Sequence, residues 1–104
     1  MREEAQMKVL DHEPQAWFLF GADQALLLDV NCSHGPAGYT VLIRLHPEEA
    51  SEYSQKGHAY LSQLAQAVQD AGPGSVYQQR DLSASYAQAS LAAVHEWRAA
   101  QPGS

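Results

Sequence analysis

The fold is decided by residues 16–45, which read AWFLFGADQALLLDVNCSHGPAGYTVLIRL. Three runs rich in aliphatic and aromatic side chains are separated by turn-forming residues at 21–23 and 34–38. Short apolar runs bounded by such residues are typical of β-strands. We therefore expect strands near 16–20, 24–32 and 39–45, and one more before Pro14, near 7–12.

The pairing of the last two strands follows from burial. Slipping an antiparallel pair by one residue turns a whole apolar set to the opposite face. With Val30 opposite Val41, Leu28 meets Ile43 and one continuous apolar face forms, whereas the slipped pairing places Leu28 opposite Arg44. We therefore expect the first register.

The preceding hairpin extends this face. A two-residue turn at Ala22-Asp23 would place Trp17 opposite Leu28 and Leu19 opposite Leu26. The predicted core face then consists of Trp17, Leu19, Leu28, Val30, Val41 and Ile43.

The pattern changes after Leu45. Pro47-Glu48-Glu49 is typical of a helix start, because proline is tolerated in the first turn and carboxylates there complement the helix dipole. Apolar residues then recur every three or four positions up to Val68, which predicts a helix. Gly57 costs about 1 kcal/mol relative to alanine within a helix, so the helix is expected to begin or bend near it.

A second helix is predicted from about Ser83 to Ala100. Its expected buried stripe consists of Ala87, Leu91, Val94 and Trp97. Between the two helices, Val76-Tyr77 would add a short edge strand.

This order of elements predicts one α+β domain over residues 1–104, with frayed ends at 1–5 and 101–104. Strands followed by helices are typical of an antiparallel sheet covered on one face. We therefore expect a meander of about four strands, with both helices on the core face.

The opposite face of that sheet is expected to be unusually apolar. It carries four large side chains, Phe18, Phe20, Leu27 and Leu42. Burying each of these side chains would stabilise the protein by about 1.5 to 3 kcal/mol, and this stabilisation is missing while the side chain stays in water. Three interpretations stay open: ordinary scattered apolar groups, partly covered by the N-terminal strand; a surface for self-association; or a site for another partner.

Charge and composition exclude several classes of function. The 104 residues carry 6 Lys+Arg against 12 Asp+Glu, a formal net charge of −6, with no basic cluster. Nucleic acid and anionic membranes are therefore not expected partners, and no apolar run approaches the roughly 18 to 20 residues of a membrane span. The first residues lack the apolar region of a secretory signal, and the single cysteine suits a reducing compartment. A soluble, cytoplasmic protein is expected.

No motif dictates a chemistry. Cys32-Ser33-His34 brings a thiol and an imidazole together, but Cys32 is expected to face the core and no zinc-ligand spacing accompanies it. Serine-nucleophile, HExxH and P-loop patterns are absent from the sequence. We assign no catalytic residue, metal or cofactor.

The sequence therefore favours a non-enzymatic protein–protein interaction module of the adaptor, inhibitor, immunity or chaperone type, acting on a protein partner or a second copy. The alternative is a small-ligand-binding protein or enzyme with a pocket near His12, Asp29 and His34. Convergence of these three side chains would favour the alternative.

Overall fold

Four strands precede four helices in the computed structural model, which describes residues 7–22, 24–32, 39–71 and 76–101. The strands are β1 (Lys8–Glu13), β2 (Trp17–Ala22), β3 (Ala25–Cys32) and β4 (Tyr39–Arg44). The helices are α1 (Pro47–Lys56), α2 (His58–Ala71), α3 (Val76–Gln79) and α4 (Ser83–Ala100). All four strands pair antiparallel in the order β1-β2-β3-β4. The predicted α+β class and meander are confirmed.

The sheet registers agree with the sequence in one pair and differ in another. Between β3 and β4, Leu28 faces Ile43 and Val30 faces Val41, as predicted. Between β2 and β3, however, Leu19 faces Leu28, because the hairpin closes at the pair Ala22 and Ala25. This register differs from the prediction by two residues, so every side chain keeps its predicted face.

β1 carries a bulge at Leu10. Val9 pairs with Phe20, whereas Asp11, two positions on, pairs with the adjacent Leu19. An extra residue of this kind resets the alternation of side chains along a strand. As a result, Asp11 faces the same side of the sheet as Leu19.

The predicted core face is covered by α1 and α2. The sheet residues on it pack against four buried residues of α2, Leu61, Leu64, Ala65 and Val68. Gly57 separates the two helices with φ +71°, a conformation in which glycine has no Cβ penalty. The sequence predicted that the helix would begin or bend near this glycine; the chain forms two helices, one on each side of it.

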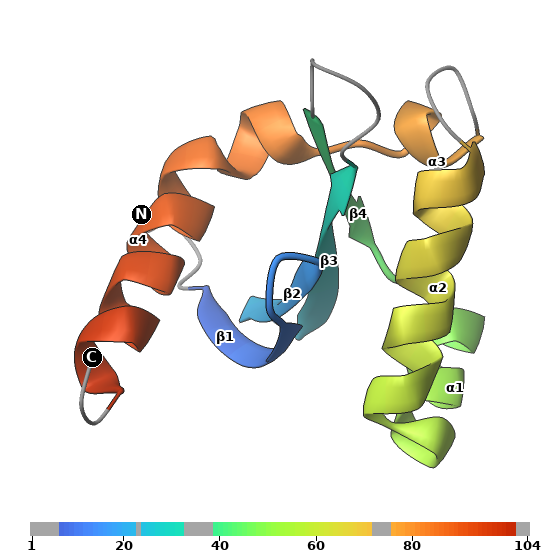
Figure 1. Ribbon diagram of the computed structural model, residues 1–104, viewed down its shortest axis with the longest axis horizontal. Coiled ribbons are helices and arrows are strands. Elements are labelled where there is room, and N and C mark those ends of the chain that lie inside the picture. The colour runs from blue at the N-terminus through green and yellow to red at the C-terminus, as the bar shows by residue number, and fades with distance from the viewer. Residues whose placement is uncertain (1–6, 23, 33–38, 72–75, 102–104) are drawn as a thin grey trace.

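The second face of the sheet is covered by α4, so the expectation that both predicted helices pack on one face is wrong (Figure 1). Phe20 and Leu27 are fully buried, and Leu42 is 1% exposed. Phe18 is half-buried against the same cluster. The proposed exposed patch of Phe18, Phe20, Leu27 and Leu42 is therefore an internal layer, because a helix of the same chain removes it from water.

α4 contacts this layer through small and aromatic residues. Ala93 is its one buried residue, and Tyr86, Ala89 and Val94 pack beside it. Trp97 contacts the ring of Phe18. The predicted stripe is therefore right at Val94 and Trp97 and wrong at Ala87 and Leu91, which are exposed, Leu91 by 72%.

The chain reaches the second face by crossing the edge of β4. The backbone amide of Leu82 donates to the carbonyl of Leu42 (2.7 Å), and the amide of Leu42 donates to Asp81 Oδ1 (2.9 Å). Arg80 donates to the carbonyl of Arg44 (2.7 Å) and binds both carboxylate oxygens of Glu49 (2.8 and 3.1 Å). These bonds pair backbone N–H and C=O groups on the edge of β4, where unpaired groups could bind another strand.

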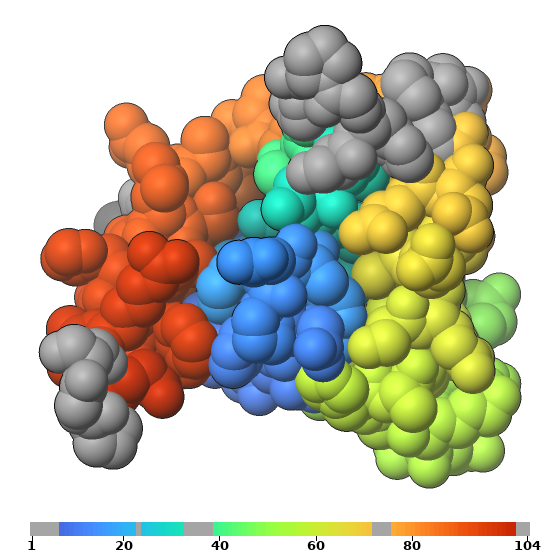
Figure 2. Space-filling model, in the orientation of Figure 1, coloured from blue at the N-terminus to red at the C-terminus, as the bar shows by residue number. Residues whose placement is uncertain are grey.

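The result is a three-layer arrangement in which β1 and β2 lie between α4 and α2 (Figure 2). The residues Val76–Gln79 form the short helix α3, not the expected edge strand. Within the described ranges, none of the helices has the length and apolar character required to cross a lipid bilayer.

Candidate functional site

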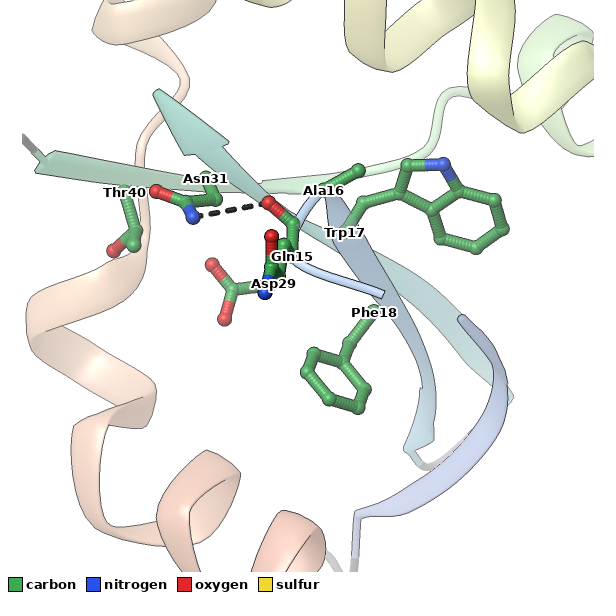
Figure 3. A pocket seen from close by; sticks show the side chains of 7 residues that line it. All are labelled: Gln15, Ala16, Trp17, Phe18, Asp29, Asn31 and Thr40. Atoms are coloured by element: carbon green, nitrogen blue, oxygen red, sulfur yellow. Dashed lines mark hydrogen bonds between the residues drawn. The ribbon is translucent and has the colours of Figure 1, made fainter. Parts of the chain in front are cut away.

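A pocket of about 260 Å³ opens on the α4 side of the sheet, near the end of β3. We call it the Asp29 pocket. It is lined by Gln15, Ala16, Trp17, Phe18, Asp29, Asn31 and Thr40 (Figure 3). Gln15, Asn31 and Thr40 are exposed and form its polar rim.

The sheet register places the lining residues. Phe18 is the cross-strand partner of Asp29, and Asn31 is the partner of Thr40, so each pair shares a face. The phenyl ring of Phe18 and the carboxylate of Asp29 project toward α4 (Figure 3). The indole of Trp17 projects toward α2 and donates a hydrogen bond to Ser62 Oγ (3.3 Å).

The turn between β1 and β2 closes one side of the pocket. Gln15 has φ +64°, and its carbonyl accepts a hydrogen bond from Asn31 Nδ2 (3.1 Å). The backbone amide of Asn31 donates to the carbonyl of Ala16 (2.8 Å). These two bonds hold the turn against β3.

Asp29 is the chemical centre of the pocket. Its Oδ1 atom is buried and has no hydrogen-bond partner. Burial, and then the negative charge of Asp81, raise the pKa of Asp29 from 3.8 to about 6. At neutral pH the carboxylate is therefore mostly ionised while one of its oxygens lacks a donor, which is a costly state.

Asp81 contributes charge to this pocket but has structural partners of its own. Its Oδ1 accepts from the amides of Leu42 (2.9 Å) and Ser83 (3.0 Å), and its Oδ2 accepts from Ser83 Oγ (2.9 Å). Asp81 thus holds the start of α4 on β4. Its negative charge still acts on Asp29.

The structure separates His12 from Asp29, two of the three residues of the predicted ligand site. His12, Phe18 and Asp29 follow one another across β1, β2 and β3 on the same face, so His12 lies about 9 to 10 Å from Asp29 across two strand spacings. His12 packs on Phe18 and on Trp97 of α4, with ring centroids 5.6 and 4.5 Å apart. It does not line the pocket, and His34 lies outside the described residues.

Cys32 lies on the opposite face and is buried among apolar side chains, as predicted. Burial is the main cause that raises the pKa of this thiol, which lowers its reactivity. Within the described part of the chain, no cluster of three or more His, Cys, Asp or Glu side chains could hold a metal ion.

One ionic cluster was not predicted by sequence reasoning. His58, at the start of α2, contacts Asp11 through Nδ1 (3.1 Å) and Glu13 through Nε2 (2.8 Å). Its ring also packs on Trp17, with centroids 4.8 Å apart. Hydrogen bonds with Glu13 and then Asp11 raise the pKa of His58. No motif marks the cluster, because its members are brought together by the β1 bulge and by helix packing.

A second pocket, of about 430 Å³, lies at the end of β4 and is lined by Arg44, Leu45, His46, Pro47, Arg80 and Leu82. Arg80 is already bound by Glu49 and by the carbonyl of Arg44. The guanidinium group of Arg80 therefore holds the segment of the chain that crosses the edge of β4. Arg44, the other arginine of this pocket, is exposed, whereas the Asp29 pocket contains a charged group with a buried, unpartnered atom.

No protein-family model, curated protein or solved structure matches this chain. The assignment of a function therefore depends on the chemistry of the pockets.

Proposed function

We propose that the protein is a non-catalytic interaction module and that a side chain of a protein partner enters the Asp29 pocket. One observation carries the proposal: a pocket framed by hydrogen bonds is lined by a carboxylate whose buried oxygen has no partner in the protein. A ligand that donates to the part of Asp29 lining the pocket would offset this unbalanced charge.

The size of the pocket supports a side chain over a whole metabolite. Its volume is about 260 Å³, whereas small-molecule sites usually enclose roughly 300 to 1,000 Å³. Protein interfaces commonly place one anchoring side chain in a pocket of the partner. The exposed rim of Gln15, Asn31 and Thr40 then offers polar contacts around the anchor.

The lining also supports binding over catalysis. In the described part of the chain, Asp29 is the one ionisable side chain that lines the pocket. General acid–base and nucleophilic mechanisms usually combine at least two such groups within hydrogen-bond reach. The interaction surface expected on Phe20, Leu27 and Leu42 is thus replaced by a site at the edge of that layer.

The proposal includes a cytoplasmic setting. Cys32 is a buried free thiol in the core, which suits a compartment that keeps thiols reduced.

The test uses a panel of N-acetyl amino-acid methylamides that covers apolar, aromatic, anionic and cationic side chains. Each is titrated into the ¹⁵N-labelled protein. We expect at least one probe to shift the amide signals of Phe18, Asp29 and Thr40 with saturation.

The variant Thr40→Trp fills the mouth of the pocket and should abolish these shifts. Gln63→Trp adds the same bulk to an exposed position of α2 and should leave them unchanged. A panel in which no probe moves the pocket signals would overturn the proposal.

A further inference from the structure

We infer that the group recognised by the Asp29 pocket is the cationic side chain of a lysine or arginine, so the partner presents a basic segment. The inference rests on the proposed function and names the chemistry of its ligand. Four observations support it.

The first observation is the charge inside the pocket. Among the described residues, the lining includes one carboxylate and no lysine, arginine or histidine. Asp81 adds a second negative charge that acts on Asp29, but its own oxygens are occupied by Leu42 and Ser83. A cation would therefore meet an uncompensated negative potential in a partly dehydrated site, where charge interactions are strong.

The second observation is the orphaned oxygen. Asp29 Oδ1 is buried without a donor, so the protein does not offset the charge of the carboxylate at this atom. A neutral ligand would leave that charge unbalanced. A cation beside the part of Asp29 that lines the pocket would balance it.

The third observation is the wall formed by Phe18. Its ring lies beside the carboxylate on the same side of the sheet (Figure 3). The edge-on contact with Trp97 (centroids 5.6 Å apart, 83° between planes) and the stacks on Phe20 and His12 hold this ring in place. The aliphatic stem of a lysine or arginine can pack on the apolar surface that Phe18 presents to the pocket.

The fourth observation is the charge of the whole chain. A formal net charge of −6 attracts a basic partner over long range and repels an acidic one. A second copy of this chain would carry the same excess of acid. Charge therefore favours a different, basic protein as the occupant.

A bound metal ion fits the pocket less well. Hard cations require several oxygen ligands at once, usually six to eight for calcium. The lining contains one carboxylate. A single carboxylate can pair with one ammonium or guanidinium group, but it does not supply the several ligands that a metal ion requires.

The closing experiment compares probes of matched shape. N-acetyl-lysine methylamide and N-acetyl-arginine methylamide are titrated against N-acetyl-norleucine methylamide, which keeps the stem without the charge. ¹⁵N chemical shifts at pH 7 give the affinities. We expect the cationic probes to bind about tenfold more tightly than norleucine, the difference that one charge-assisted hydrogen bond usually makes.

Asp29→Asn keeps the shape of the side chain and removes its charge, so it should erase the preference for cations. Asp70→Asn is the matched control, because it removes one charge from an exposed position of α2. At pH 5, binding of the cationic probes to the parent should weaken about tenfold, because the pKa of Asp29 is about 6 and protonation removes the charge.

The outcomes separate the two claims. If norleucine binds as tightly as lysine and Asp29→Asn changes nothing, the pocket takes a side chain but the inferred charge preference is wrong. If no probe moves the pocket signals, the proposed function fails and the inference fails with it. A well-dispersed spectrum of Asp29→Asn confirms that the variant is folded.

Discussion

The two faces of the sheet are both covered by helix, but the helices contribute different amounts of side-chain volume. On one face, Leu61, Leu64 and Val68 of α2 interlock with aliphatic residues of β3 and β4. On the other, the fully enclosed large side chains come from the sheet; α4 buries Ala93, and its Tyr86, Val94 and Trp97 pack beside this layer while partly exposed. The Asp29 pocket opens on this second face. The face covered by α2 stabilises the fold, and the face covered by α4 holds the candidate site.

The sharpest test of this comparison uses neighbours in β3. Leu28 faces α2, Leu27 faces α4, and both are fully buried. Each change to alanine should cost about 2 to 5 kcal/mol in unfolding free energy. We expect Leu28→Ala to lie in the upper half of that range, since its interlocked neighbours relax less. Urea unfolding measures both, and a larger cost for Leu27→Ala would reverse the assignment of the stabilising face.

A single charge introduced on the buried side of α4 tests how this helix is oriented against the sheet. Ala93 is 4% exposed and Leu91 is 72% exposed. Ala93→Glu should lower the unfolding free energy by about 3 kcal/mol, because it buries an unpaired carboxylate against the sheet. Leu91→Glu should stay within about 0.5 kcal/mol of the parent. Equal effects in thermal denaturation would contradict the orientation of α4.

The connection between the two faces should depend on Arg80. This side chain is 18% exposed and binds Glu49, which is 16% exposed, through two nitrogen atoms. Arg80→Ala should cost about 2 kcal/mol, the usual scale for hydrogen bonds between charged groups. Arg98→Ala, at an exposed position of α4, is the control. In a double-mutant cycle, Arg80→Ala and Glu49→Ala should be less than additive; full additivity would mean that the pair is not coupled.

The charge on the α4 face should be visible in the pH dependence of stability. The pKa of Asp29 is raised from 3.8 to about 6, so the folded state binds more protons between these values. Stability of the parent should therefore fall as pH rises from about 4 to 6 and stay lower above that range. Asp29→Asn removes this loss and should be more stable by about 1 to 2 kcal/mol at pH 7, with no gain below pH 4. Parallel stability curves for parent and variant would contradict a buried charge.

The smallest expected effect lies on the α2 face. Hydrogen bonds with Glu13 and Asp11 raise the pKa of His58, so its stabilising contribution is present below about pH 6.5 and is lost as pH rises through the raised pKa. Because the side chains are partly exposed, the contribution should be about 0.2 to 1 kcal/mol. Proton NMR titration of the imidazole should show its pKa falling in Glu13→Gln. An unchanged titration curve would show that the contact is not formed in solution.

The strand pattern illustrates what local sequence signals can predict. Alternating burial identified the strands, the core face and the β3–β4 register, because a slip of one residue would have placed Arg44 opposite Leu28. Alternation is blind to a slip of two residues, since all side chains keep their faces. The β2–β3 register was therefore missed, and it was decided by a turn in which Gln24 adopts φ +69°.

The helix α4 on the second face illustrates what local sequence signals cannot predict. The sequence showed that Phe20, Leu27 and Leu42 share a face, but not whether a partner or the chain itself covers it. The alanine-rich composition of α4 also concealed its buried side, and Leu91, the most apolar residue of its central turns, points to solvent. Small residues contribute little to an apolar stripe, even where they make the contact.

By itself, the sequence determined the α+β class, the two faces of each strand, the break at Gly57 and the excess of negative charge, because these follow from neighbours along the chain. The tertiary structure decided which face receives α4, the burial of Asp29 and the proximity of Asp81 to it. Asp29 and Asp81 are more than 40 residues apart in the chain. Asp29 is an ordinary surface carboxylate in the sequence pattern, and its raised pKa arises only because folding buries it and brings the charge of Asp81 near.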